Sequence, residues 1–196
     1  MPTLQEQFGP IDIYLFDQLL RGRITPGMRI FDAGCGSGRN LVYFLREGYD
    51  VFGVDADPRA IDLVRTLGPA GNFRVEALDQ MSFPDAFADV VLSSAVLHFA
   101  RADDQFRAML AGTWRVLKPG GFFFCRLAST IGMEDRMRRI EGRRFLLPDG
   151  SQRYLVDEAL LLQLTGELGG SLADPLKTTV VQSQRCMTTW AVWKNR

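Results

Sequence analysis

The stretch that decides the fold is Arg29-Ile30-Phe31-Asp32-Ala33-Gly34-Cys35-Gly36-Ser37-Gly38-Arg39-Asn40. A short apolar run ends at an acidic residue, glycines follow at three alternate positions, and a helix is expected to begin after them. A glycine-rich turn between a strand and a helix is typical of nucleotide-binding sites, because its free N–H groups and the positive end of the helix dipole face the ligand. The spacing is G-x-G-x-G, and Arg39 stands where the dinucleotide-binding pattern requires its third glycine.

The composition is that of an ordinary globular protein without a charge excess. The chain of 196 residues is long enough for one domain with a sizeable core, and 46% of it is apolar. Lys and Arg together number 23, as do Asp and Glu, so the formal net charge is zero. This balance argues against broad binding to nucleic acid or to a membrane surface.

The few metal-ligating and thiol side chains predict no metal site and no disulfide framework. Cys35, Cys125 and Cys186 are odd in number and widely spaced, and His98 is the single histidine. The sequence has no secretory signal and no apolar run long enough to cross a bilayer. We therefore expect a cytoplasmic protein in a reducing compartment.

Apolar strands that alternate with helices are expected over the first two thirds of the chain. A helix is predicted over 3–22, followed by strands at 29–33, 50–54, 73–77, 89–93 and 122–126. Helices are predicted at 38–47, from Asp57-Pro58 to about 67, and at 102–116. Continuous apolar strands between helices indicate a parallel sheet that is covered on both faces.

The last third changes in character. The Arg-rich segment 136–144 contains interspersed acids, which favours a solvated, salt-bridged helix over a clamp for a carboxylate or phosphate. A hairpin of 145–147 with 153–155 is predicted around the turn Leu147-Pro148-Asp149-Gly150, and a helix over 157–168 with Asp157 as N-cap. The runs 178–182 and 188–193 are joined by a short connection, which forces an antiparallel pair.

Carboxylates follow three successive predicted strands. Asp32, Asp55 and Asp79 each stand at the end of one strand. Ligands of open α/β sheets bind in the crevice at the carboxyl ends of the strands, so these acids are expected to share one site. For Asp32 the alternative is a plain turn residue at a strand end, and for Asp79 it is a solvated loop acid.

The glycine loop, Asp55, Asp79, the strand at 88–92 and the turn Leu117-Lys118-Pro119-Gly120-Gly121 together resemble the class I S-adenosylmethionine-dependent methyltransferases. The resemblance is close over 29–126 and topological over 155–194. It implies an α/β fold with a seven-stranded, mostly parallel Rossmann-like sheet, helices on both faces and an antiparallel last strand. It also implies S-adenosylmethionine as cofactor and S-adenosylhomocysteine as product.

The resemblance assigns roles to the residues of the crevice. Asp32 would accept from loop N–H groups or from the methionyl ammonium, Asp55 from the ribose hydroxyls, and Asp79 from the adenine amino group, with Leu78 or Met81 against the ring. The expected cofactor-binding residues are Asp32, Gly34, Cys35, Gly36, Gly38, Asp55, Ala56, Asp79, Gln80 and Ser94.

Two residues are candidates for catalysis. His98 follows the fourth strand, where the family places the transferred methyl group, and it is either a general base or a packing residue at a helix start. Tyr14 lies on the N-terminal helix, which is either a lid that brings a hydroxyl to the methyl donor or a cover for the sheet. The loop lacks the Asn-Pro-Pro-Tyr motif of amino-group methylases of bases and glutamine.

We expect a single domain over 1–196, with a helical cap or lid at 1–26, a cofactor-binding core at 27–126, a substrate-side insertion at 127–156, and a C-terminal helix and β-hairpin at 157–196. The predicted function is methyl transfer to a small molecule, by a monomer or homodimer. Three alternatives stay open: a non-catalytic regulatory protein that binds S-adenosylmethionine or a nucleotide, a methyltransferase acting on RNA or protein, and an NAD-type oxidoreductase. Arg39 and the antiparallel last strand argue against the oxidoreductase.

Overall fold

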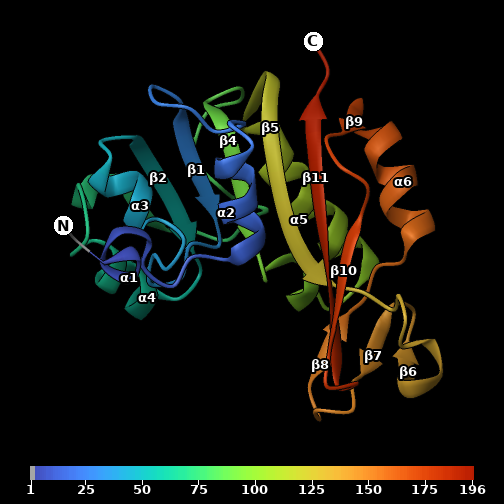
Figure 1. Ribbon diagram of the computed structural model, residues 1–196. Helices are drawn as coiled ribbons and strands as arrows, with labels where there is room; N and C mark the ends of the chain where they lie inside the picture. The colour runs from blue at the N-terminus through green and yellow to red at the C-terminus, as the bar shows by residue number, and fades with distance from the viewer. Residues whose placement is uncertain (1–2) are drawn as a thin grey trace.

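The apolar strands form one central sheet in the computed structural model, which describes residues 3–196 (Figure 1). Across the sheet the order is β10-β11-β5-β4-β1-β2-β3, and the short β9 pairs with β11. The strands are β1 (Arg29–Ala33), β2 (Asp50–Asp55), β3 (Phe73–Val75), β4 (Ala88–Ser94), β5 (Leu117–Ala128), β9 (Gly170–Leu172), β10 (Lys177–Val181) and β11 (Arg185–Lys194).

Strand direction follows the expected Rossmann-like pattern. The pairs β1–β2, β2–β3, β1–β4 and β4–β5 are parallel, whereas β11 runs antiparallel to both β5 and β10. Strands β1 and β4 lie at the centre and are almost fully buried, which explains their continuous apolar sequences. The predicted fold class is therefore confirmed, including the antiparallel last strand.

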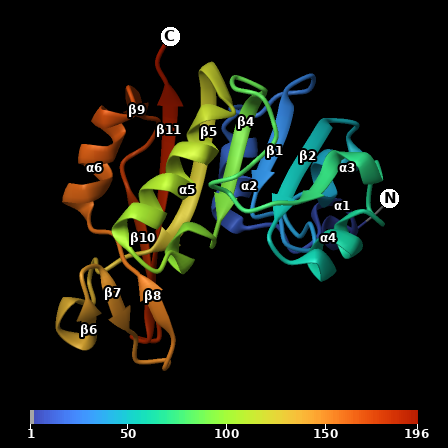
Figure 2. The same ribbon diagram turned by 180° about the vertical axis from the view of Figure 1, so that it is seen from behind.

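Helices cover both faces of the sheet. On one face lie α1 (Leu4–Phe8), α2 (Ile13–Leu20), α3 (Val42–Arg46) and α4 (Pro58–Val64); α2 crosses in front of the sheet in Figure 1. On the other face lie α5 (Asp103–Arg115) and α6 (Glu158–Glu167), which are in front in Figure 2. Short 3-10 turns lie at η1 (Ala70–Asn72), η2 (Leu97–Phe99) and η3 (Glu134–Arg136).

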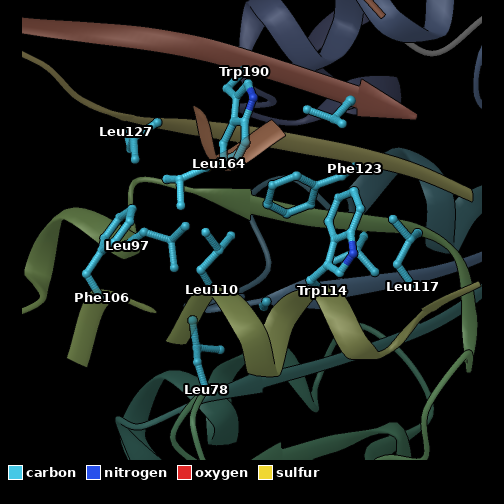
Figure 3. Close-up of a cluster of buried hydrophobic side chains, with 14 of the residues drawn as sticks. Leu78, Leu97, Phe106, Leu110, Trp114, Leu117, Phe123, Leu127, Leu164 and Trp190 are labelled. Atoms are coloured by element: carbon cyan, nitrogen blue, oxygen red, sulfur yellow. The ribbon is translucent and has the colours of Figure 1, made fainter. Parts of the chain in front are cut away.

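Aromatic side chains hold α5 and α6 against the sheet (Figure 3). The ring of Phe123 on β5 meets Trp114 and Trp190 edge-on, with centroid distances of 5.7 and 5.6 Å. Trp190 is fully buried, and its Nε1–H donates to Thr165 Oγ1 at 2.9 Å. Since buried aromatic pairs and a satisfied indole N–H both favour one arrangement, this face is a rigid support for the strand ends.

The N-terminal helix is broken, which corrects the prediction of one helix over 3–22. Gly9 ends α1 with a φ of +61°, and Pro10 follows it. Asp12 then caps α2, where its side chain accepts from the Tyr14 N–H. The helix predicted from residue 38 likewise begins only at Val42, β3 ends two residues early, and β5 begins at Leu117.

The prediction of a helix in the Arg-rich segment is wrong. Residues of this segment form β6 (Arg138–Glu141), which pairs with β7 (Arg144–Leu146), and β7 pairs with β8 (Gln152–Tyr154). Gly142, with a φ of +51°, makes the turn between β6 and β7. The predicted hairpin around 145–155 is confirmed as β7–β8, and Asp157 caps α6 by accepting from Leu160 N–H at 2.8 Å.

Within residues 3–196, no helix has the length and apolar character needed to cross a membrane.

Candidate cofactor site

The glycine loop after β1 is shaped by backbone that only glycine adopts easily. Gly34 and Gly36 have φ values of +87° and +53°. A Cβ on Gly34 would lie 2.4 Å from Val96 Cγ2, so the loop after β4 packs directly against this glycine. No heavy atom lies within 4 Å of a Cβ placed on Gly36, so this residue leaves the loop open toward the crevice.

Asp55 ties the glycine loop to the turn after β2. Its Oδ2 accepts from Gly36 N–H at 2.9 Å, and its Oδ1 accepts from Asp57 N–H at 2.9 Å. Asp57 caps α4 by accepting from Arg59 N–H, and Pro58 occupies the first helical turn, as the sequence predicts. Each oxygen of Asp55 keeps a lone pair that is free to accept from a ligand hydroxyl.

A cavity of about 560 Å³ opens at the carboxyl ends of β1, β2 and β4. It brings together seven of the predicted cofactor-binding residues, namely Gly34, Cys35, Gly36, Asp55, Ala56, Asp79 and Ser94. Its volume and its mixed apolar and polar walls are in the range of a small-molecule site. Leu78 also lines it, whereas Met81 is buried outside the lining.

Asp32 lies beneath the loop and does not line the cavity. It is 2% exposed, and its Oδ1 has no hydrogen-bond partner. Burial raises the pKa of Asp32 to about 7; Arg39 opposes this rise and Asp55 adds to it. An unpaired buried carboxylate oxygen is costly, so Asp32 fits a role as acceptor for a cationic donor brought by a ligand.

Two further predicted cofactor-binding residues lie outside the cavity lining. Gly38 packs against α4, since a Cβ there would lie 2.7 Å from Val64 Cγ2. Gln80 is exposed, and its backbone N–H closes a turn by donating to Ala77 O at 3.0 Å. Both positions shape loops that border the site.

The geometry of His98 favours the structural alternative over the general base. His98 is 5% exposed in η2, and its Nδ1 accepts from the Ala128 N–H at 3.1 Å. This bond requires a neutral ring with its proton on Nε2, so neither nitrogen keeps a lone pair for proton transfer. Burial, with Arg153 nearby, lowers the pKa of His98 to about 4. The imidazole therefore holds the end of β5 against the loop after β4.

Tyr14 is likewise engaged elsewhere. Its hydroxyl is hydrogen-bonded to Thr179 Oγ1 on β10, and its ring lies 4.7 Å from the guanidinium carbon of Arg126. Neither contact directs the hydroxyl into the cavity lining. Through this hydrogen bond Tyr14 links α2 to β10, an edge strand of the sheet.

A buried ionic cluster beside the cavity was not anticipated as a unit. The Asp12 side chain is 1% exposed, and its Oδ2 accepts from Arg126 Nη1 at 2.9 Å and from Ser94 Oγ at 3.4 Å. Arg39 Nη2 lies 3.7 Å from the same oxygen, and Asn40 Oδ1 accepts from the Asp12 N–H. Local sequence holds no signal for this cluster, because its members come from four separate segments.

The sequence comparisons agree with this site. Residues 31–125 match a family described as a methyltransferase domain. An uncharacterized methyltransferase of Synechocystis is 33% identical over 100 residues, which cover 51% of this chain and 47% of that protein. The chain thus spans about half the length of the curated relatives it matches.

Solved structures agree on the fold over nearly the whole chain. A methyltransferase of Methanosarcina mazei superposes with a TM-score of 0.75 at 21% identity, covering 90% of this chain and 97% of that one. The 1,6-didemethyltoxoflavin-N1-methyltransferase of Burkholderia thailandensis, solved with bound 1,6-didemethyltoxoflavin and S-adenosylhomocysteine, superposes with a TM-score of 0.69 at 21% identity, covering 93% of this chain and 76% of that one. Residues 31–125 thus match a methyltransferase domain, and the chain as a whole has the Rossmann-like fold of the class I S-adenosylmethionine-dependent methyltransferases.

Proposed function

We propose that the protein transfers a methyl group from S-adenosylmethionine to a small-molecule acceptor. The observation that carries this proposal is Asp55, a carboxylate that braces the glycine loop through Gly36 N–H and faces a cavity at the strand ends. In this role Asp55 accepts from the ribose hydroxyls, and Asp79 accepts from the adenine amino group beside Leu78. Asp32 lies beneath the loop and outside the cavity lining, so its unpartnered oxygen accepts from the methionyl ammonium where the glycine loop opens toward it.

The cofactor supplies an activated methyl group, so the protein mainly orients the acceptor. Holding two reactants in line lowers the activation barrier by roughly 7–11 kcal/mol. Arg39 lines the cavity and supplies a positive charge for the methionyl carboxylate. The apolar side chains of Phe99 and Val96 line another part of the wall and keep water away from the reacting groups. Since His98 has no lone pair to spare, the acceptor reacts in a form that is already nucleophilic.

The small-molecule acceptor is favoured by two observations. The toxoflavin-precursor methyltransferase, similar in fold, holds a small molecule together with S-adenosylhomocysteine. The formal net charge of zero gives no electrostatic basis for binding to the RNA backbone. We propose that the described part of the cap, 3–26, and the insertion at 127–156 lie on the acceptor side, because Asp12 of the first contacts Ser94 and Arg153 of the second contacts Phe99, both in the cavity wall.

Calorimetric titration of S-adenosylmethionine and S-adenosylhomocysteine tests the proposal. Asp55→Ala removes two charge-assisted hydrogen bonds within the loop and those to the ribose, so affinity should fall by about 10–100-fold. Asp62→Ala is the matched control, because Asp62 is an exposed acid on α4 whose ion-pair partner is its neighbour Arg65. Well-folded wild type that binds neither compound would refute the proposal.

A further inference from the structure

A row of polar side chains crosses one face of the sheet beneath α2. Ser94, Arg126, Thr189 and Lys177 are direct neighbours in register on β4, β5, β11 and β10. One layer deeper the same face is apolar, with Leu92, Phe124 and Ala191 almost fully buried. The row reaches the cofactor cavity through Ser94, which lines its wall, and polar side chains on an otherwise apolar buried face require hydrogen-bond partners.

Two neighbours in this row have polar atoms without a partner. Arg126 Nε and Thr189 Oγ1 are both buried and make no hydrogen bond, although their residues face each other across β5 and β11. Thr189 is 4% exposed and the Arg126 side chain 19%. A guanidinium nitrogen only donates, and a threonine hydroxyl also donates. The missing partner is therefore a group that accepts hydrogen bonds and, next to Arg126, carries negative charge.

The carboxylate of Asp12 is a negatively charged acceptor next to Arg126, but it satisfies only part of the guanidinium. Its carboxylate reaches Arg126 through Nη1 alone and leaves Nε unpaired. Asp12 comes from the start of α2, which is fastened over the row by hydrogen bonds between side chains, Tyr14 to Thr179 and Lys177 to Asp17. Water can replace such polar contacts when the helix moves away, so they allow the row to be uncovered.

We propose that the row binds a carboxylate of the methyl acceptor through Arg126 and Thr189, and that Asp12 occupies part of this position until the acceptor displaces it. This inference rests on the proposed function, since Ser94 joins the row to the cofactor cavity. A carboxylate on Arg126 would hold the rest of the acceptor next to the strand ends where the methyl donor binds. The acceptors are thus carboxylate-bearing small molecules, and their neutral analogues bind poorly.

The first test uses benzoate and benzamide, which share a ring and differ in charge. Each is titrated by calorimetry into the protein saturated with S-adenosylhomocysteine. Benzoate should bind wild type at least about tenfold more tightly than benzamide, and this preference should vanish in Arg126→Gln and shrink in Thr189→Val. Equal binding of the two probes, no binding of benzoate, or an unchanged preference in Arg126→Gln would overturn the proposal.

The second test separates a displaceable Asp12 from a purely structural ion pair. Asp12→Asn keeps the volume and the helix cap but removes the competing charge, so benzoate affinity should rise by about tenfold. Thr179→Val is the control, because it releases a different contact of the same helix, the hydrogen bond with Tyr14, and frees no charge. A rise that is absent in Asp12→Asn, or equal in Thr179→Val, would mean that Asp12 only anchors α2 and would refute the inference.

Two controls keep these outcomes interpretable. Thermal unfolding of each variant shows whether it folds. If Arg126→Gln does not fold, the test rests on the Thr189→Val and Asp12→Asn variants, which conserve side-chain volume. Binding of S-adenosylhomocysteine to wild type reports on the proposed function separately. If it fails, the benzoate titrations are made on the protein alone, so that the anion site is judged independently of the cofactor.

Discussion

Asp32 should make the ligand-free protein less stable as the pH rises. Burial raises its pKa from 3.8 to about 7, so the folded state holds a proton that the unfolded state releases. The stability that this proton supports is complete below the unfolded pKa and is lost as the pH rises through the folded pKa. From pH 5 up to the folded pKa the loss is about 1.36 kcal/mol for each pH unit, and it levels off above that pKa, so it totals about 3 kcal/mol by pH 8.

Asp32→Asn should remove this dependence, because an amide does not titrate. The measurement is the free energy of unfolding in urea for wild type and Asp32→Asn at several pH values. The difference between them should grow in favour of the variant by about 3 kcal/mol from pH 5 to pH 8, or roughly 5–10 °C in Tm. Any constant cost of burying the amide shifts all points equally and leaves the slope unchanged.

The same variant should bind S-adenosylhomocysteine poorly, because the acceptor for the methionyl ammonium has lost its charge. A ligand cation next to Asp32 lowers its pKa, so saturating S-adenosylhomocysteine should also flatten the pH dependence of wild type. The reasoning is refuted if the stability difference between wild type and Asp32→Asn stays constant over this pH range.

Two further predictions concern the loops around the cavity. Gly34→Ala should destabilise the protein by at least about 2 kcal/mol more than Gly22→Ala, as measured by urea unfolding. Both glycines have positive φ, but only a Cβ at Gly34 would meet the side chain of Val96. Equal losses of stability in the two variants would contradict the close approach of Val96 to Gly34. Wild type should lose about 2 kcal/mol relative to His98→Gln when the pH falls from about 7 to 5, because the unfolded ring, with a pKa of 6.5, gains a proton over this range while the buried ring, with a pKa of about 4, stays neutral. The glutamine keeps an acceptor for Ala128 N–H, and parallel pH profiles of the two proteins would show that His98 is not buried as a neutral ring.

The sequence predicted those parts of the site that are formed by residues close together in the chain. The glycine loop and Asp55 follow from strand ends and helix starts, which are set by neighbours in the chain, and β1 has the predicted bounds 29–33. The Arg-rich β6 was misread, because its charges fit an exposed strand as well as an exposed helix and all four of its residues are exposed.

Contacts between distant segments could not be predicted in the same way. Asp12 and Arg126 are 114 positions apart, and nothing near either residue marks it as the partner of the other. His98 shows the same limit: its residue type left a general base and a packing residue open, and only the bond from Ala128 N–H, set by the folded path of β5, favours the packing residue. Residue type narrows the chemistry, and tertiary placement decides it.

The position of β11 in the sheet has a consequence for how the chain folds. β11 lies between β5 and β10, although it is the last strand in the sequence. During synthesis β5 therefore keeps an open edge until β11 has been made, and its apolar side chains stay exposed to other chains for that time. Sheet completion also joins residues that are far apart in sequence, which slows folding. The antiparallel strand that marks the family is thus also the step at which a nascent chain is most exposed to aggregation.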